Sequence, residues 1–432
     1  MSLLRRMKFG RVNINLQARL GIDTFGGIQT LSFMTGKEYV RSFKYQFSSK
    51  VGELIFSCFN MKKIMIIGAG FAGLSAAKRL FRTGLALEIT LFDKKGQVNF
   101  LPLIPDCIGR GINPKFLVND VASLYRNSKI RFIRQEVTSV DLAIGQIRAG
   151  LTTYVYDYLV IASGSQPNFF SNPDAQAYGH PLNNVIDVQE IISCLKENSF
   201  EHLIICGAGY TGVEAATNLW LYFKKRGMLK KIIIVERAPA ILGVLPDWMK
   251  DYVARNLKSM GIEVLINSVI EKIQADKVSV SGGREFPRSV LIWVPGVKTA
   301  EFIQKLDIPK NPQGRIVVDE YLRAGQNCFC AGDTAFFSRK NSFLRMAIQF
   351  AIAQGDQAAK NIIRSIKNIP LKKYRPLDLG YIIPMANNRS CGRVLGLNVL
   401  GHLATFLHFS MCVFRSMGLK NKAGIINNLL KG

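Results

Sequence analysis

Two sets of glycines, each followed by an acid, are the residues whose spacing suggests a chemical role. Both have the spacing G-x-G-x-x-G: Gly68, Gly70 and Gly73 in the first set, and Gly207, Gly209 and Gly212 in the second. The first glycine permits a tight turn, the second lets a pyrophosphate approach the backbone, and the third lets the next helix lie close to the strand. About twenty residues after each set stands an acid, Asp93 or Glu236, whose carboxylate can accept both ribose hydroxyls. Two complete copies predict two dinucleotide sites.

Each glycine set lies where a strand, a helix and a second strand are expected. Residues 64–67 form an unbroken apolar run, as expected of a parallel strand buried on both faces. The helix that follows aims its free N–H groups at the phosphates. A second apolar strand over residues 87–92 ends at Asp93, and residues 201–236 repeat the whole order. Glu236 favours the free 2′-hydroxyl of NAD over the phosphate of NADP, although Arg237 beside it leaves NADP open.

Glu214 follows the last glycine of the second set by two residues, which places it in the first turns of the expected helix. One interpretation is a carboxylate stabilised by the positive end of the helix dipole. The other is a catalytic group that contacts the nicotinamide or the edge of a flavin.

Other stretches are expected to close around a ligand. Residues 158–165 read as a buried strand that runs into a turn of small residues, where the backbone can close over a cofactor. Residues 291–296 give a strand with a glycine turn, and residues 327–333 a strand that delivers Asp333 into a turn. Residues 99–105 are apolar and broken by prolines, which favours a loop near a ligand. Short strands are expected at residues 130–133, 136–140 and 154–163.

Composition describes a globular chain of two or three domains: 432 residues, 48% hydrophobic and 20% charged. A net charge of +27 indicates an anionic partner. Nucleic acid is not expected, because the basic residues are scattered and show no aromatic-interleaved motif; a membrane surface is the other candidate. The eight cysteines include no C-x-x-C, so neither a redox dithiol nor a metal site is predicted. Cys206 and Cys330 lie in apolar runs and are expected to be core thiols in a reducing compartment.

The two ends of the chain differ from the middle. Residues 1–60 hold nine Lys/Arg against three acids and are treated as a peripheral extension. Such a leader is typical of a transit peptide, although Met61 would also serve as a natural start.

From residue 360 onward there are twelve Lys/Arg and one acid, Asp378. The run between Arg393 and Arg415 carries no charge, and its large apolar residues fall at helical spacing. They are Leu403, Phe406, Leu407, Met411 and Phe414. Gly, Asn and His residues make this run a poor spanning helix, so a helix lying in a membrane interface is predicted, with His402 and His408 as packing residues.

Together, the two glycine sets, residues 161–165 (IASGS) and residues 329–333 (FCAGD) resemble the two-dinucleotide flavoprotein reductases. The resemblance implies that the first set holds FAD and the second holds NAD(P)H. The implied FAD residues are Gly68, Gly70, Phe71, Ala72, Gly73, Asp93, Lys94, Val137, Ala162, Ser163, Gly164, Asp333 and Ala347. The implied NAD residues are Gly207, Gly209, Tyr210, Thr211, Gly212, Glu236 and Gly296.

Within that superfamily the chain looks like the type II NADH:quinone oxidoreductases. Residues 347–355 (AIQFAIAQG) are similar to the quinone motif A-Q-x-A-x-Q-Q, and the tail is similar to the membrane-docking end of those enzymes. The resemblance implies quinone contacts at Gln349, Phe350 and Ala353, with Gln349 and Glu214 as catalytic residues. Ala353 stands where a second glutamine is expected, which leaves the acceptor open. The alternative is a packing stripe made by Ala347, Phe350, Ala351 and Gln354.

The implied architecture is α/β, with two Rossmann-like dinucleotide-binding domains and a C-terminal membrane-associating helical segment. The FAD-binding domain is expected at 61–180 and 298–375, the inserted NAD(H)-binding domain at 181–297, and the membrane-docking segment at 376–432. A homodimer is a further possibility that the resemblance raises.

The expected function is FAD-dependent oxidation of NADH with two-electron reduction of a membrane quinone, without proton pumping. The expected location is peripheral, on the cytoplasmic face of a bacterial inner membrane, or the mitochondrial inner membrane if residues 1–60 are a transit peptide. Alternative enzymes are a sulfide:quinone oxidoreductase, which needs a cysteine pair at the flavin, or another NAD(P)H-dependent flavoprotein reductase. An alternative of another class is an FAD-holding membrane scaffold with little turnover.

Overall fold

The computed structural model describes residues 19–25, 28–34, 41–44, 61–126, 128–197, 199–339 and 342–431. The chain divides into two units, Met1–Met61 and Lys62–Gly432. In the first unit, β1 (Arg19–Phe25), β2 (Ile28–Met34) and β3 (Arg41–Lys44) form an antiparallel sheet in that order. The other residues before Met61, on which the expectation of a transit peptide depends, lie outside the described residues.

A parallel five-stranded sheet carries the first glycine set. Its order is β24-β12-β4-β5-β8. The strands are β4 (Lys62–Ile67), β5 (Leu87–Phe92), β8 (Ile130–Ile133), β12 (Tyr158–Ile161) and β24 (Cys328–Cys330). Apolar side chains such as Ile64, Leu91 and Phe329 are almost fully buried, as the predicted buried strands require. One edge strand, β24, comes from much later in the chain, so the sheet is built from two separate segments.

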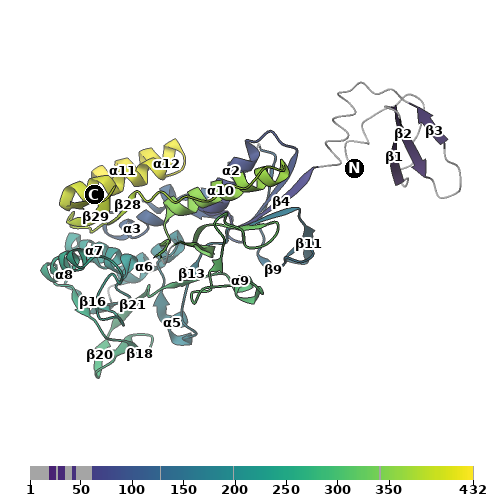
Figure 1. Cartoon of the computed structure of the whole chain (residues 1–432). Helices are drawn as coiled ribbons and strands as arrows, with labels where there is room; N and C mark the ends of the chain where they lie inside the picture. Colours follow the sequence, from purple (N-terminus) through teal and green to yellow (C-terminus); the bar gives the residue numbers. More distant parts are fainter. Residues whose placement is uncertain are drawn as a thin grey trace. The chain divides into compact units, whose positions relative to one another are not determined.

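Two long helices lie side by side over this sheet (Figure 1). They are α2 (Phe71–Phe81), which follows the first glycine set, and α10 (Ile348–Ile366). Gly355 of α10 faces Ala72 so closely that an added Cβ would lie 2.0 Å from the Ala72 carbonyl oxygen. Because this glycine has no side chain, α10 comes close to the glycine turn.

A second parallel sheet carries the second glycine set. Its order is β14-β21-β15-β16-β17. The strands are β14 (Gly179–His180), β15 (His202–Cys206), β16 (Lys231–Val235), β17 (Glu263–Leu265) and β21 (Ser289–Trp293). Its helices are α6 (Val185–Glu197), α7 (Tyr210–Lys225) and α8 (Asp247–Ser259). The sequence predicted an α/β fold with one parallel sheet for each glycine set, and the structure confirms it.

The C-terminal segment adds a small sheet and two helices. They are β28 (Gly380–Ile383), β29 (Ser390–Val394), β30 (Leu397–Leu400), α11 (Gly401–Arg415) and α12 (Leu419–Lys431). Phe409, Cys412 and Ile425 are buried in one hydrophobic core with side chains of α6 and α7. Among the described residues, no helix has the length and apolar character needed to cross a membrane.

Shorter elements connect these parts. Antiparallel strands are β9 (Val137–Asp141), β10 (Gln146–Ala149), β11 (Thr152–Val155), β18 (Ile270–Ile273), β19 (Lys277–Val280) and β20 (Arg284–Pro287). Short strands are β6 (Gln97–Asn99), β7 (Val118–Asp120), β13 (Gln166–Pro167), β22 (Val297–Lys298), β23 (Ile316–Val317), β25 (Ala335–Phe336), β26 (Ser338–Arg339) and β27 (Ser342–Phe343). Short helices are η2 (Leu101–Leu103), α3 (Asp106–Gly109), η3 (Pro114–Leu117), α4 (Val121–Tyr125), α5 (Pro173–Tyr178), α9 (Glu301–Lys305) and η4 (Gly332–Thr334).

Two local expectations were wrong. The stretch 99–105 is not a loop throughout, because β6 ends in it and η2 forms one 3-10 turn. The stretch 154–163 is not a single strand but the end of β11 and then β12. The helix expected over the apolar tail residues is confirmed as α11.

The contact between α10 and α2 predicts the effect of one added methyl group. Gly355→Ala should destabilise the protein by about 1 to 3 kcal/mol, because the new Cβ would overlap backbone that cannot move freely. Ile352→Ala, on an exposed position of the same helix, is the control for helix substitution. The midpoint of thermal unfolding measures both. Equal midpoints for the two variants would show that the helices do not need this close approach.

Candidate functional site

One cavity of about 900 Å³ in the second unit is lined by many of the residues that the sequence predicted to bind a cofactor or substrate. Its wall includes the first glycine turn, the turns after β5 and β12, and the start of η4. The starts of α7 and α10 and the first strand of the C-terminal sheet also contribute to it. The cavity therefore lies where the first five-stranded sheet, the start of α7 and the C-terminal segment meet.

The two glycine turns have the same geometry. Gly68 and Gly207 have φ angles of 101° and 102°, which residues with a side chain rarely adopt. A Cβ on Gly68 would lie 2.2 Å from the Ala162 carbonyl oxygen, and a Cβ on Gly207 would lie 2.7 Å from the Pro295 Cα. In each copy, the turn is pressed against the loop that follows the neighbouring parallel strand.

The two acids close these turns. Asp93 accepts a hydrogen bond from the Ala69 N–H at 2.9 Å, and Glu236 accepts one from the Ala208 N–H at 2.7 Å. Asp93 also accepts from the backbone of Lys95 and Gly96. Since a carboxylate offers about four lone-pair positions, Asp93 keeps room for roughly one more hydrogen bond. The expectation that it accepts both ribose hydroxyls therefore exceeds this capacity.

A third turn is held by buried polar contacts. Asp333 lines the cavity and accepts a hydrogen bond from the Ser165 hydroxyl at 2.8 Å. Burial raises the pKa of Asp333 above its usual range. The buried Arg315 donates to the Asp333 carbonyl oxygen at 2.8 Å. Gln354, 2% exposed on α10, accepts from the Gly332 N–H at 2.8 Å, so α10 fixes the backbone of this turn.

Comparison with known proteins gives the family. Residues 62–358 match the pyridine nucleotide-disulphide oxidoreductases. The chain belongs to this family. A type II NADH:quinone oxidoreductase of Staphylococcus aureus is 24% identical over 380 residues, which cover 80% of this chain and 93% of that protein. The demethylphylloquinone reductase NdbB of Synechocystis is 25% identical over 373 residues, covering 82% and 92%.

Solved structures show the same fold. NDH2 from Plasmodium falciparum, solved in complex with NADH, matches with a TM-score of 0.75 at 15% identity, covering 86% of this chain and 98% of that one. The sulfide:quinone oxidoreductase of Aquifex aeolicus matches with a TM-score of 0.72 at 20% identity, covering 84% and 92%.

The residues expected to hold FAD gather at the cavity of this oxidoreductase. Those that line it are Gly68, Gly70, Phe71, Ala72, Asp93, Lys94, Val137, Ala162, Ser163, Gly164, Asp333 and Ala347. Gly73 does not line it; a Cβ there would lie 1.8 Å from the Gly68 carbonyl oxygen, so this glycine serves helix packing. At Gly70 an added Cβ would meet no atom within 4 Å, and no side chain caps α2, so the first N–H groups of α2 face open space. This cradle fits the diphosphate of a dinucleotide.

The residues expected to hold NAD divide into two groups. Tyr210 and Thr211, at the start of α7, line the cavity. Gly207, Gly209, Gly212, Glu236 and Gly296 do not line it. The three glycines form the turn and the start of α7, while Glu236 and Gly296 come after β16 and β21, so α7 reaches the cavity only through Tyr210, Thr211 and Glu214.

Glu214 also lines the cavity, in the second turn of α7. The effect of a helix dipole falls off within the first turn, so the helix-dipole interpretation is not supported. Burial and the neighbouring charge of Asp106 raise the pKa of Glu214 well above its usual range. A carboxyl that keeps its proton at the wall of a cavity can act as an acid.

Gln349 lines the cavity with its side chain fixed by two acceptors. Its amide nitrogen donates to Asp378 at 3.0 Å and to the Gly380 carbonyl oxygen at 3.3 Å. The Arg345 guanidinium donates two hydrogen bonds to the Asp378 carboxylate, with N···O distances of 2.5 and 2.7 Å. It also lies over the Tyr381 ring. The pKa of Asp378 is lowered, chiefly by the hydrogen bond from Arg345.

The other two residues expected at a quinone do not reach the cavity. Phe350 is 3% exposed and packs beneath Arg345, while Ala353 is exposed on the outer face of α10. The expected packing stripe accounts for Phe350, since it lies in the interior.

Sequence reasoning missed several residues of the wall. Arg345 and Tyr381 line the cavity, and His408 lines it from α11. Arg345 holds Gln349 in place through Asp378. A signal for this contact was present in the sequence: Asp378 is an isolated acid in a basic tail, which indicates that it pairs with a specific cation. No spacing pattern indicated the β28–β30 sheet, which brings Tyr381 to the site. His408 was expected to pack at the membrane interface, but it faces the cavity and its pKa is lowered to about 4 by burial and by Arg110.

The two glutamines of α10 predict different effects on the flavin site. Gln354→Leu leaves the buried Gly332 N–H without its acceptor, which costs about 1 to 3 kcal/mol and loosens the turn that carries Asp333. Flavin content after purification, read from absorbance, should fall. Gln349→Leu is the matched control, because it lies on the same helix but does not contact Gly332. Equal flavin content in the two variants would contradict a role for Gln354 at this turn.

Proposed function

We propose that this chain is an FAD-dependent enzyme that oxidises NADH and transfers two electrons to a membrane quinone, without proton pumping. One observation carries the proposal: a single cavity connects the first glycine turn with the start of the second glycine helix and with Gln349. A flavin in that cavity would have a donor site on one side and an acceptor site on the other. The named relatives, a type II NADH:quinone oxidoreductase and a demethylphylloquinone reductase, support this assignment.

The proposal gives each part of the chain a task. The first sheet, with 61–180 and 298–375, holds FAD, and 181–297 holds NADH, with Glu236 favouring NADH over NADPH. Bound FAD would supply the redox chemistry, which is two-electron transfer between NADH and the quinone. The protein orients the reactants and excludes water. Asp93 and the first N–H groups of α2 would hold the nucleotide, and Asp333 lines the same cavity from η4, where Gly332 lies close to Ala72 of α2.

The geometry of Gln349 limits how it can bind a quinone. Both of its hydrogen bonds among the described residues use the amide nitrogen, because Asp378 and the Gly380 carbonyl are acceptors. The remaining group, the oxygen Oε1, can only accept. Quinone oxygens also only accept, whereas a hydroquinone has O–H groups to donate. Gln349 is therefore suited to bind the hydroquinone, and to favour its formation.

A cysteine-based reaction is not part of the proposal. Sulfide:quinone oxidoreductases share this fold, but no cysteine of the described residues lines the cavity. Cys107, the nearest to the first glycine set in sequence, is buried, and its thiol donates to the Leu103 carbonyl oxygen. Burial raises its pKa, which keeps the thiol protonated and a poor nucleophile.

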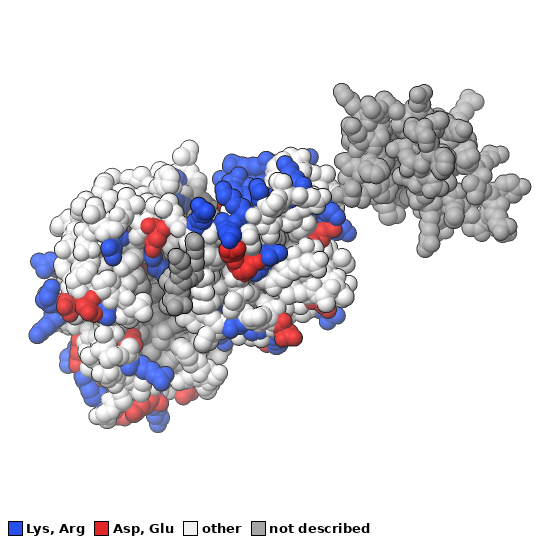
Figure 2. All heavy atoms as spheres, viewed as in Figure 1, with Lys and Arg blue, Asp and Glu red and all other residues white. Residues whose placement is uncertain are grey.

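The C-terminal segment is the proposed membrane contact. Large apolar side chains lie exposed along β29, β30, α11 and α12: Leu395, Leu397, Leu403, Phe406, Phe414, Leu419 and Leu430 are each 58–85% exposed. In Figure 2 the surface over α11 and α12 is mostly uncharged, while Lys and Arg gather over α2 and α10. Exposed apolar groups with flanking cations fit the interface of an anionic bilayer, and peripheral attachment follows. We propose that the protein binds the cytoplasmic face of a bacterial inner membrane, or the mitochondrial inner membrane if residues 1–60 are a transit peptide.

Turnover of the purified protein tests the function. NADH oxidation, followed by its absorbance, should depend on added quinone and produce one hydroquinone for each NADH. NADPH should be a poorer donor. NADH oxidation that is the same with and without quinone would contradict the proposal.

Gln349 predicts an effect on one half-reaction. Gln349→Leu should slow reduction of quinone roughly 2- to 12-fold, equivalent to one net hydrogen bond, and leave oxidation of NADH nearly unchanged. Rapid-mixing measurements of each half-reaction separate the two. Gln176→Leu, exposed and away from the cavity, is the control. A Gln349 variant slowed equally in both halves would show a structural role.

The exposed apolar surface predicts how the protein binds vesicles. Replacing Leu403, Phe406 and Phe414 by Ser should release the protein from anionic vesicles, because each buried side chain contributes about 1.5 to 3 kcal/mol. Truncation is a poor test, since Phe409, Cys412 and Ile425 belong to the core. Ser at Leu151 and Leu229, which are exposed elsewhere, is the matched control. Unchanged sedimentation of the triple variant with vesicles would contradict the proposed surface.

A further inference from the structure

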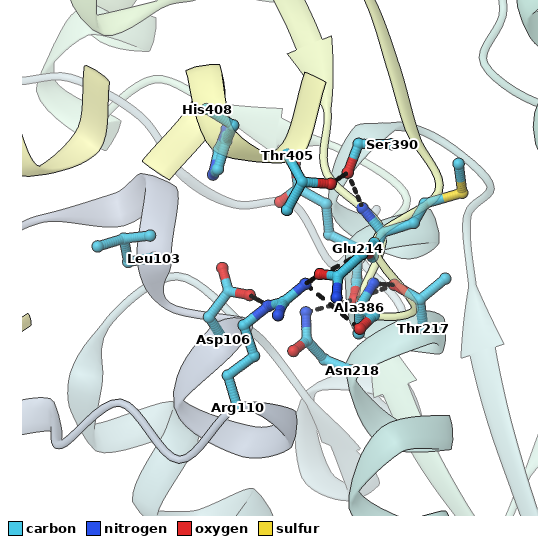
Figure 3. Close-up of polar contacts among 12 residues, drawn as sticks. Leu103, Asp106, Arg110, Glu214, Thr217, Asn218, Ala386, Ser390, Thr405 and His408 are labelled. Atoms are coloured by element: carbon cyan, nitrogen blue, oxygen red, sulfur yellow. Dashed lines mark hydrogen bonds and ion pairs between the residues drawn. The ribbon is translucent and has the colours of Figure 1, made fainter. Parts of the chain in front are cut away.

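A buried polar cluster lies directly behind the cavity wall at Glu214 (Figure 3). Asp106 of α3 is 2% exposed and pairs with the Arg110 side chain at 3.1 Å. Arg110 also donates to the Asn388 side chain at 2.8 Å and to the carbonyl oxygens of Met385 and Ala386. One cation thus joins α3 to the chain between β28 and β29. Asp106 remains buried because this cation compensates its charge.

The close packing of α3 on α7 brings Asp106 next to Glu214. A Cβ on Gly109 would lie 2.4 Å from the Asn218 carbonyl oxygen, so α3 reaches this position only because Gly109 has no side chain. The Asn218 amide nitrogen donates to the Glu214 carbonyl oxygen at 3.0 Å, and its side chain also hydrogen-bonds Asp106. Asn218 Oδ1 is buried without a hydrogen-bond partner among the described residues.

We propose that Asp106 is a positioning residue: by holding a second carboxylate beside Glu214, it keeps on Glu214 the proton that quinone reduction consumes. This inference rests on the proposed function. Reduction of a quinone to a hydroquinone adds two electrons and two protons. The hydride of NADH accounts for two electrons and one proton. The second proton must come from an acid or from water, and Glu214 is an acid at the cavity wall.

The charges around the pair agree with one shared proton. Burial raises the pKa of Asp106 to about 6, partly offset by Arg110, so Asp106 is ionised at neutral pH. Burial, together with the carboxylate of Asp106, raises the pKa of Glu214 well above its usual range, so Glu214 keeps its proton. Arg110 is paired with Asp106, and after Glu214 gives up that proton, two carboxylates lie next to each other. Their repulsion draws a new proton from water to Glu214.

Apart from Arg110, the titratable groups that face Asp106 and Glu214 are three neutral side chains and one cation. His408 and Cys412 of α11 are both neutral at pH 7, because burial and Arg110 lower the pKa of His408 to about 4 and burial raises the pKa of the Cys412 thiol. Tyr210 of α7 is also neutral, since burial raises its pKa. Arg415 of α11 remains the second cation near the pair, after Arg110. Asp106 is therefore the neighbouring charge that adds to burial in keeping the proton on Glu214.

The pH dependence of quinone reduction tests the proposal. Turnover should fall as pH rises through the pKa of Glu214, since the proton is then missing. Asp106→Asn removes the neighbouring negative charge and lowers that pKa, so the falling limb should move to lower pH. Asp106→Glu, which keeps the charge, should restore the limb towards its original position. Asp106→Ser is made in parallel, so that a folding failure of one neutral variant leaves another.

Two controls separate positioning from general damage. Asp319 forms the same i,i+4 pair with Arg323 away from the cavity, so Asp319→Asn should leave the limb in place. In a Glu214→Gln background, Asp106→Asn should have no further effect on the profile. An unmoved limb in Asp106→Asn, or an equal movement with Glu214 already replaced, would overturn the proposal.

An infrared titration decides the same point without turnover. The resting protein should show a band of a protonated carboxylic acid near neutral pH, which disappears in Glu214→Gln and titrates at lower pH in Asp106→Asn. If the chain reduced no quinone but showed these bands, the proposed function would fail and the carboxyl pair would stand. If quinone reduction were present and the band were absent, the pair would be overturned alone.

Discussion

The close approach of backbone at two glycine turns is the constraint on which the cavity depends. Gly68 and Gly207 lie so near the loops after the neighbouring strands that no side chain fits at either position. The acids Asp93 and Glu236 then fix both turns through the backbone N–H groups of Ala69 and Ala208. In the first copy, the turn leaves the start of α2 open for an anionic ligand; in the second, it aims the start of α7 at the same cavity.

The remaining walls come from segments distant in sequence that pack onto this frame. α10 lies against α2 through Gly355, which places Gln354 on the Gly332 turn and Gln349 at the cavity. The C-terminal sheet adds Tyr381 and, through Arg345 and Asp378, sets the direction of the Gln349 amide. The same tail exposes apolar side chains on its outer face. The C-terminal segment therefore contributes to the proposed acceptor site and also carries the proposed membrane contact.

The sequence predicted what local spacing encodes. Glycine spacing, buried apolar runs and the following acids indicated both sheets, α2, α7 and most residues of the cradle, because each depends on neighbours close in the chain. Spacing could not reveal contacts between distant segments. Neither Asp106 beside Glu214 nor Arg345 on Asp378 has a local signature, and the β28–β30 sheet depends on packing against α7 and α8. The family resemblance suggested Ala353 for the quinone, yet the packing of α10 against α2 turns that position outward.

Anaerobic titration of the purified protein tests most directly whether one cavity connects a donor to an acceptor through a flavin. NADH added without quinone should bleach the flavin absorbance at one NADH per flavin. A later addition of quinone should restore the absorbance and yield one hydroquinone per flavin. A protein that carries flavin but is not bleached by NADH, or a bleached flavin that quinone does not restore, would contradict the account.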